Sequence, residues 1–305
     1  MRNIKRIGVI GAGKHFKKNV YPVLKKSKSY KIISFLKHKK KNFEGHTFIS
    51  EKEFFKEKLD FVYIATPNHL HDKYIIKSLE ANFHVICEKP FVIKKKNIQK
   101  ILNLSKYKKR LIFESFMYMY HPIFNEIKKI IESNKFGKLR YIISNWKHPS
   151  LNKKNNQYSK NLGEGFRFDG ASYPISFDNF FFKKNKKMQI DSIKGNVDLR
   201  GCIFFNSQNV KRYYFWGEGQ NYRNDLELFF SKATVYVEQF YAKRSNDVLS
   251  LKIHKDFKIN EKKIENKNHF FLMFKNILNN YSSKKFQEYH RKKILNQSKY
   301  LLSGK

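Results

Sequence analysis

The chain has 305 residues, enough for two domains of ordinary size, and 41% of its residues are hydrophobic. Its formal net charge of +39 raises the question of a nucleic-acid partner. Only ten of the 64 basic residues are arginine, although base readout favours arginine for its bidentate fork. Lysine is spread over the whole chain with abundant Asn, Ile, Phe and Tyr, all encoded by A/T-rich codons. Genome bias therefore explains the charge more simply than a specific nucleic-acid site, and a role in binding polyanions is the alternative.

The cysteines and the apolar runs indicate the compartment. Cys87 and Cys202 have no CxxC or other ligand spacing, so we expect free thiols in a reducing cytoplasm. The apolar run at residues 7–10 is too short for the core of a signal peptide. No apolar stretch approaches the roughly 20 residues that span a membrane, so we expect no membrane partner.

In the first part of the chain, short apolar runs alternate with helical patterns. This alternation at short spacing predicts a parallel, doubly wound sheet. The expected strands cover residues 7–10, 32–36, 61–65, 84–87 and 111–113, and the expected helices cover residues 19–24, 51–58, 72–81 and 96–106.

A Gly-x-Gly pair, Gly11 and Gly13, stands between the first expected strand and the first expected helix. Gly11 allows a tight turn, and Gly13 lets the backbone approach a pyrophosphate held at the helix N-terminus. Lys14 and His15 follow in the same turn, and we expect both to contact a dinucleotide. Phe16 replaces the third glycine of the fingerprint, so a simple tight turn into a helix is the alternative.

A basic run follows the second expected strand and begins with Lys37 and His38. A fold that prefers NAD carries an acid here for the ribose hydroxyl, whereas cations attract the 2′-phosphate of NADP. The run therefore favours NADP over NAD as the cofactor. A solvated basic loop is the alternative in such a lysine-rich chain.

Residues 66–71 follow the third expected strand and include two histidines. We expect Thr66, Pro67, Asn68 and His71 to contact the cofactor or substrate, because ligands bind at the carboxyl ends of parallel strands. No third ligand stands at a matching spacing from His69 and His71, so we expect no metal site.

The fourth expected strand ends in Glu88-Lys89-Pro90. Proline cannot donate to a sheet ladder and disfavours helix in the residue before it. Lys89 should therefore lie just past the end of a buried strand, where a charge or a proton acts on a bound substrate. We expect Glu88 to lie beside the cofactor.

Three segments in this order resemble the Gfo/Idh/MocA family of nicotinamide-dependent oxidoreductases: Gly11-Ala12-Gly13, residues 65–71 and Glu88-Lys89-Pro90. Residues 114–122 are similar to the segment that closes the Rossmann domain in the glucose-fructose oxidoreductase-like and dihydrodiol dehydrogenase-like branch, although Met119 replaces the arginine usual there. The resemblance implies an NAD(P) cofactor, a carbohydrate-type substrate and a homodimer or homotetramer.

The pattern changes after about residue 122. A helix is expected to about residue 133, a strand at 139–143, β-rich runs between 187 and 264, and helical spacing again in 267–302. Strands without intervening helices predict a largely antiparallel sheet. We therefore expect an α/β protein with a Rossmann dinucleotide-binding domain at 1–122. An α+β domain with an open sheet, at 123–305, would bind substrate and form oligomers.

Residues 163–174 resemble the family's glycine-rich loop and Asp-x-Gly-x-His motif, in the variant that has Tyr-Pro in place of histidine. Asp169 and Tyr173 are four residues apart and would share one face of a helical turn. The resemblance gives Tyr173 the place of the proton-transferring histidine, and Asp169 would orient substrate hydroxyls or Lys89. A capped helix start, with Asp169 as the cap and Tyr173 as a packing residue, is the alternative.

These residues predict an NAD(P)-dependent oxidoreductase. It would transfer a hydride between nicotinamide and a hydroxyl or carbonyl of a sugar, sugar derivative or sugar nucleotide. Lys89, Tyr173 and Asp169 would form the catalytic group, because a hydroxyl loses a hydride only if its proton is also removed. The alternative is a catalytically inactive dinucleotide-binding regulator of the same fold.

Overall fold

The computed structural model describes residues 4–36, 43, 47–152, 156–159, 162, 165–182, 187–243 and 248–303. The chain divides into two compact units. Unit 1 consists of Met1–Ser115 and Met273–Leu302, and unit 2 consists of Phe116–Leu272 and Ser303–Lys305.

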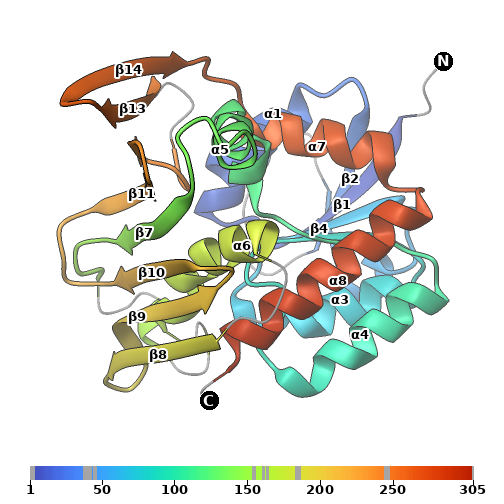
Figure 1. The fold of residues 1–305 in the computed structure, drawn as a ribbon. Coiled ribbons are helices and arrows are strands. Elements are labelled where there is room, and N and C mark those ends of the chain that lie inside the picture. Colours follow the sequence, from blue (N-terminus) through green and yellow to red (C-terminus); the bar gives the residue numbers. More distant parts are fainter. Residues whose placement is uncertain are drawn as a thin grey trace. The chain divides into compact units, whose positions relative to one another are not determined.

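Unit 1 is built on a six-stranded sheet in the order β3-β2-β1-β4-β5-β6, and all neighbouring strands are parallel (Figure 1). This order confirms the predicted Rossmann sheet, because it reverses beside β1 and creates the crevice that binds dinucleotides. The short β3 was not expected, since three residues are too few to show a strand pattern. The strands are β1 Lys5–Ile10, β2 Tyr30–Leu36, β3 Thr47–Ile49, β4 Phe61–Ile64, β5 His84–Cys87 and β6 Ile112–Glu114.

Helices connect these strands, and their starts follow local chemistry. The shortest α-helix of these connections, α2, begins with a capping box: the Ser50 hydroxyl accepts from the amide of Glu53, and the Glu53 carboxylate accepts from the amide of Ser50. It ends at Phe54, four residues before its expected end. The connecting helices are the π-helix η1 Phe16–Val20, α1 Tyr21–Lys25, α2 Glu51–Phe54, the 3₁₀ helix η2 Asn68–Leu70, α3 His71–Glu80 and α4 Lys95–Tyr107.

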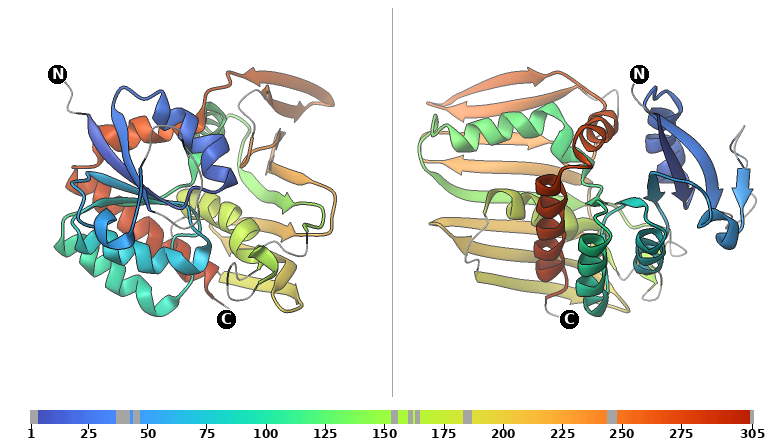
Figure 2. Two further views of the ribbon diagram at one scale, coloured as in Figure 1. Left: turned by 180° about the vertical axis from the view of Figure 1, so that it is seen from behind. Right: turned by 90° about the vertical axis from the view of Figure 1, so that its right-hand side faces the viewer.

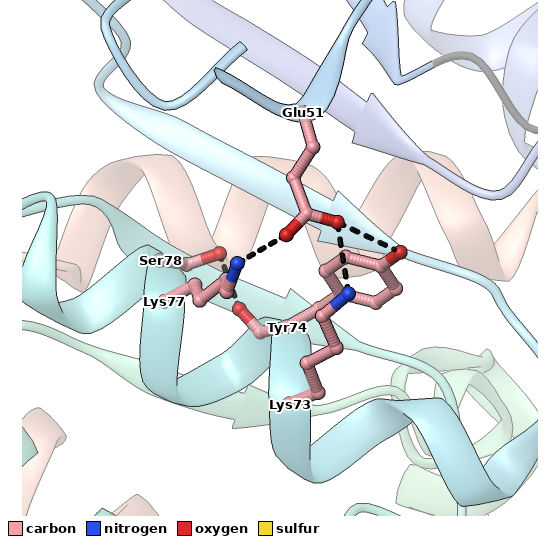
Figure 3. A network of polar contacts seen from close by, with 5 residues as sticks. All are labelled: Glu51, Lys73, Tyr74, Lys77 and Ser78. Atoms are coloured by element: carbon pink, nitrogen blue, oxygen red, sulfur yellow. Dashed lines mark hydrogen bonds and ion pairs between the residues drawn. The ribbon is translucent and has the colours of Figure 1, made fainter.

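A polar cluster joins α2 to α3 (Figure 3). The Glu51 carboxylate lies between the ammonium groups of Lys73, at 2.9 Å, and Lys77, and it accepts from the Tyr74 hydroxyl at 3.4 Å. Burial would raise the pKa of Glu51, but the two lysines hold it below its ordinary value. Its charged members are partly exposed, so we assign this cluster to helix packing, where such ion pairs contribute about 1 kcal/mol or less.

The end of the chain returns to unit 1 as most of α7 His269–Asn280 and all of α8 Lys284–Leu301. The Tyr30 hydroxyl donates to the Phe274 carbonyl at 3.1 Å, and the rings of Phe113 and His290 lie 4.5 Å apart. Both helices bury apolar side chains in this unit. The compact units therefore differ from the expected division, which placed all of residues 123–305 in the second domain.

Unit 2 contains an eight-stranded sheet in the order β14-β13-β12-β11-β7-β10-β9-β8 (Figure 2). Only β7 and β10 pair in parallel among its described strands, which confirms the prediction of a largely antiparallel sheet. The strands are β7 Leu139–Lys147, β8 Lys187–Lys194, β9 Asp198–Ser207, β10 Val210–Gly217, β11 Arg223–Phe230, β12 Thr234–Glu238, β13 Leu249–Lys255 and β14 Lys258–Ile264.

Helices of unit 2 cover one face of its sheet, and a fully buried ion pair joins the two layers. Asp178 of α6 and Arg212 of β10 are both 0% exposed, and their Oδ1 and Nε atoms lie 2.5 Å apart. The Tyr214 hydroxyl donates to the same carboxylate oxygen at 3.0 Å. Breaking such a pair would leave an uncompensated buried charge, so it holds α6 firmly on the sheet. The helices of unit 2 are η3 Met117–Tyr120, α5 Pro122–Glu132, η4 Asn156–Tyr158, the π-helix η5 Arg167–Ala171 and α6 Ser172–Phe181.

Candidate active site

Unit 1 brings the polar segments that follow its strands to one edge of the sheet. The register pairs Ile10 with Ile64, Ile64 with Cys87, and Cys87 with Glu114, so these four residues form one row. The loops after them therefore leave the sheet together. This is the edge at which open parallel sheets bind ligands.

The loop after β1 fits a dinucleotide. Gly11 has a φ of +88°, and a Cβ atom there would lie 2.6 Å from the carbonyl carbon of Ala65 and 2.7 Å from the amide nitrogen of Thr66. A Cβ atom at Gly13 would meet no atom within 4 Å. The loop thus passes close to the neighbouring loop at Gly11 and leaves open space at Gly13. Lys14, exposed, follows at the start of the helix, where backbone amides attract a pyrophosphate.

Phe16 explains why the third glycine is dispensable. Its side chain is 0% exposed, and its ring lies 5.9 Å from that of Phe35, 5.9 Å from that of Phe43 and 5.7 Å from that of Tyr63. The aromatic ring fills the space between helix and sheet that a glycine normally closes. The chain passes this point as the wide-turned helix η1, so the helix begins earlier than the expected residue 19.

The segment after β4 contains a histidine contact that was not expected. His71 is fully buried, with Nδ1 2.8 Å from the Pro90 carbonyl oxygen and Nε2 3.0 Å from the Thr66 carbonyl oxygen. Burial lowers the pKa of His71, against the effect of the two carbonyls. His71 therefore links the two edge loops through its ring nitrogens, and its expected contact with the cofactor stays a prediction.

The other expected residues of this segment stay at the edge. Thr66 is 9% exposed, and its hydroxyl oxygen is buried without a hydrogen-bond partner among the described residues. Pro67 is exposed and Asn68 is half-buried at the start of η2. An orphaned hydroxyl beside Gly11 fits a bound ligand that completes the site.

Glu88 is the centre of a hydrogen-bonded group just after β5. The Tyr63 hydroxyl donates to Glu88 Oε1, and His15 Nε2 lies 3.3 Å from the same oxygen. Burial would raise the pKa of Glu88, but His15, Tyr63 and Lys89 hold it below its ordinary value. Tyr63 was not among the expected site residues. A tyrosine inside an otherwise apolar buried strand is itself a signal, because its hydroxyl needs a partner.

Lys89 is the next residue after Glu88 and interacts with two carboxylates, those of Glu88 and Glu114. It is half-buried, and the peptide bond to Pro90 is cis. Its ammonium group lowers the pKa of Glu88 and opposes the rise in the pKa of Glu114 that burial causes. The structure thus brings Lys89 together with two carboxylates, of which only Glu88 was expected in the site.

Unit 2 holds Asp169 and Tyr173. Asp169 lies in η5, a π-helix, where an ordinary helical turn was expected, and neither η5 nor α6 has a side-chain cap. The N-cap residues are Phe166 for η5 and Ala171 for α6, so Asp169, which is half-buried, does not cap either helix. Tyr173 is 4% exposed, and its ring centroid lies 4.6 Å from that of Trp146 and 5.5 Å from that of Tyr241.

A glycine fixes this arrangement. A Cβ atom at Gly170 would lie 2.7 Å from Trp146 and 2.9 Å from Trp216, so the helix can approach the sheet only with glycine there. The Tyr118 hydroxyl lies 2.8 Å from the Ser176 hydroxyl and 3.4 Å from the Tyr173 carbonyl oxygen, which it can donate to. The ring of Tyr118 also lies 5.9 Å from that of Tyr173, so aromatic packing holds Tyr173 on several sides.

Four of the residues named in the sequence cannot be placed, and the described residues contain neither a metal site nor a membrane-spanning helix. Lys37 and His38 lie outside the described residues, as do Gly163 and Glu164 of the glycine-rich loop. In the described part of the chain, no three or more His, Cys, Asp or Glu side chains are arranged to hold a metal ion. No helix in the described ranges has the length and apolarity to cross a membrane.

The strand order, the Gly11 turn and the edge loops define a dinucleotide-binding Rossmann protein. Residues 5–116 match the family described as "Oxidoreductase family, NAD-binding Rossmann fold". These residues therefore match the Gfo/Idh/MocA oxidoreductases, the family that the sequence motifs resemble.

Curated relatives match part of the chain. The dTDP-3,4-didehydro-2,6-dideoxy-alpha-D-glucose 3-reductase of Saccharopolyspora spinosa is 24% identical over 188 residues, covering 60% of this chain and 57% of that protein. An uncharacterized oxidoreductase of Rhizobium meliloti is 32% identical over 124 residues, covering 41% of this chain and 37% of that protein. These matches thus span less than two thirds of the relatives' own length.

Solved structures match nearly the whole of this chain. A 3-ketoreductase from Actinomadura kijaniata, in complex with NADP and TDP-benzene, superposes with a TM-score of 0.91 at 17% identity, over 98% of this chain and 96% of that one. An aldose-aldose oxidoreductase from Caulobacter crescentus gives 0.86 at 13% identity, over the same shares. At these identities the likeness establishes the two-domain fold.

Proposed function

We propose that this protein is an NAD(P)-dependent oxidoreductase that transfers a hydride between nicotinamide and a hydroxyl or carbonyl of a sugar, sugar derivative or sugar nucleotide. The observation that carries the proposal is the row of strand ends in unit 1. It places the Gly11–Gly13 turn, the segment after β4 and Glu88-Lys89 at one sheet edge. That edge is where dinucleotides bind in this fold.

The cofactor would lie along this edge. Gly13 and the helix start at Lys14 would hold the pyrophosphate, and Thr66 with Asn68 would contact the cofactor beyond it. We propose NADP in preference to NAD, with Lys37 and His38 near the 2′-phosphate. Relatives support this choice: the A. kijaniata enzyme was solved with NADP, and a D-xylose 1-dehydrogenase (NADP(+)) from Hypocrea jecorina is 29% identical over 119 residues. When bound, nicotinamide supplies the hydride chemistry itself.

The protein's own residues would handle the proton. In carbonyl reduction, Tyr173 would donate its hydroxyl proton to the oxygen as the carbon gains the hydride, and oxidation reverses both transfers. The ammonium group of Lys89 would stabilise the tyrosinate that results, because a neighbouring cation favours the anion. Asp169 would orient the substrate hydroxyls.

The number of residues between a lysine and a tyrosine in a relative supports the roles of Lys89 and Tyr173. The A. kijaniata 3-ketoreductase was also solved as variants with one tyrosine changed to phenylalanine and one lysine changed to alanine. That lysine and that tyrosine are the same number of residues apart in that enzyme as Lys89 and Tyr173 are here.

The substrate class also comes from relatives. A dTDP-sugar reductase, an inositol 2-dehydrogenase of Corynebacterium glutamicum and a xylose dehydrogenase each match part of this chain. The substrates in these names are a sugar nucleotide, a sugar and a cyclitol, each with a hydroxyl or carbonyl group that can exchange a hydride. Half-buried Trp146, beside Tyr173, gives a substrate ring an apolar surface.

Two measurements test the proposal in sequence. Fluorescence titration with NADPH and NADH should show binding, tighter for NADPH, and a panel of free sugars, polyols and dTDP-sugars should then reveal turnover. Binding without turnover of any compound would favour the inactive regulator. Absence of nicotinamide binding would defeat both functions.

We further propose that a second copy of this chain covers the open face of the sheet in unit 2. Several side chains on this face are apolar or aromatic and partly exposed. Tyr213 stands in register between Ile143 and Phe204, and Tyr141, 46% exposed, pairs with Phe229. Such a face on a water-soluble sheet favours association. Sedimentation equilibrium should show a dimer or tetramer.

We also propose that the protein works in the cytoplasm. Cys87 and Cys202 are both free in the structure, as a reducing compartment would keep them. Fractionation of the source cells with an antibody should find it in the soluble cytoplasmic fraction.

A further inference from the structure

Glu114 ends β6 in the same row of strand ends that carries the candidate site. It is 1% exposed and stands opposite Cys87, two residues before Lys89. The amide of Phe91 donates to its Oε1 atom at 2.9 Å, whereas Oε2 is buried without a hydrogen-bond partner among the described residues. A carboxylate buried this far needs charge compensation.

A lysine of α8, Lys293, compensates the charge of Glu114. The ring of His290 packs on Phe113 at 4.5 Å, so this face of the helix lies against β6. Lys293 is three residues further on, on the same helical face. Lys293 is half-buried and interacts electrostatically with Glu114. Both residues belong to unit 1.

We propose that Glu114 and Lys293 form a buried charge pair that sets the protonation state of Lys89 and thereby its readiness for catalysis. Both act as positioning residues, and their value to the enzyme rests on the function proposed above. Glu88 and Glu114 supply two negative charges at this edge, and Lys89 and Lys293 supply two positive ones. Removal of one charge leaves the other three unbalanced in a poorly solvated place.

The remaining groups around Glu114 do not disturb this balance. Burial raises the pKa of Cys87 and lowers that of His290, so both are neutral near pH 7. Asp72, 4% exposed, interacts with Cys87 and accepts a hydrogen bond from Asn97 at 2.6 Å. It is unchanged in every variant considered below.

Burial also makes the pair sensitive to pH. It raises the pKa of Glu114, against the effects of the Phe91 amide, Lys293 and Lys89, and it lowers the pKa of Lys293. Each group therefore changes its charge closer to neutral pH than an exposed acid or lysine would. The charge near Lys89 then depends on pH in the range where dehydrogenases work.

The test measures Lys89 itself, without substrate. Pulses of an acylating reagent at different pH values, followed by peptide mass spectrometry, give the pH midpoint at which the Lys89 amine becomes reactive. Glu114→Gln should lower this midpoint by about one pH unit, and Lys293→Met should raise it by a similar amount. The double variant should return it to the wild-type value. Lys292→Met, an exposed neighbour on α8, should leave it unchanged.

Opposite shifts that cancel in the double variant support the proposal. Unchanged midpoints, or shifts in one direction for both single variants, overturn it. If circular dichroism shows that Glu114→Gln fails to fold, Glu114→Asp, which keeps the charge, must retain the wild-type midpoint. Lys293→Met alone must then still raise the pH midpoint of Lys89. Because the readout needs no turnover, opposite shifts in a protein that binds no nicotinamide would refute the proposed function and leave the charge pair standing.

Discussion

The hydroxyl of Tyr63, inside β4, donates a hydrogen bond to the carboxylate of Glu88, the residue before Lys89. The rings of Phe16 and Phe274 hold the tyrosine ring at 5.7 and 6.0 Å. An aromatic core thus fixes the loop that carries the candidate catalytic lysine.

Tyr63→Phe tests this relationship. The ring packing is kept, but Glu88 loses one of its two donors, and loss of a hydrogen bond to a charged group costs about 1.5–3 kcal/mol of unfolding free energy. The pKa of Glu88 is lowered in the folded state, so its stabilising effect is present above the unfolded pKa and is lost as pH falls through the folded pKa. The loss in the variant should therefore be larger at neutral pH than at acid pH.

Urea denaturation at a series of pH values measures this loss. Tyr74→Phe is the matched control, because its hydroxyl contacts the more exposed Glu51 at 3.4 Å and should matter by less than about 0.5 kcal/mol. Equal losses for the two variants would show that the Tyr63 contact has no special role.

The two glycines of the β1 loop should separate stability from binding. Gly11→Ala should destabilise unit 1 by at least about 1–3 kcal/mol, because its φ is positive and the new methyl group would collide with the Ala65 carbonyl. Gly13→Ala meets no protein atom, so the fold should be unaffected while NADPH affinity falls. Urea denaturation and fluorescence titration on both variants check this. Unchanged affinity in Gly13→Ala would contradict the cofactor placement.

Tyr173→Phe should keep the aromatic packing against Trp146 and Tyr241 and lose most turnover. Loss of a general acid or base typically costs a factor of about 10²–10⁴. If the hydroxyl accepts the proton during oxidation, the effect should grow at low pH. A pH profile of kcat for the wild type and the variant measures this, and an unchanged profile would exclude proton transfer by Tyr173.

Local pattern predicted much of unit 1. Strand ends followed by glycine or proline motifs indicated the loops at the sheet edge, because parallel strands place their carboxyl ends together. The structure confirms these strands and puts Lys89 two residues after β5. The three-residue β3 was invisible, since no periodicity can appear in so short a run.

Contacts between segments far apart in the chain could not be predicted from the sequence. The return of α8 to unit 1, and with it Lys293 to Glu114, depends on tertiary packing between segments far apart in the chain. His71 was expected at the cofactor because its position at a strand end allows it. Only the structure shows both ring nitrogens facing backbone carbonyls. The π-helices at Phe16 and Arg167 coincide with a buried aromatic ring and with a glycine packed closely on the sheet, and local helix propensity does not report such tertiary packing.

Turnover by Lys89→Ala tests the central claim most directly, measured with any substrate that the wild type accepts and beside Lys95→Ala, an exposed lysine on α4. We predict that Lys89→Ala folds and binds NADPH like the wild type but loses turnover by a factor of about 10² or more, while Lys95→Ala is unaffected. Wild-type turnover in Lys89→Ala would contradict the account.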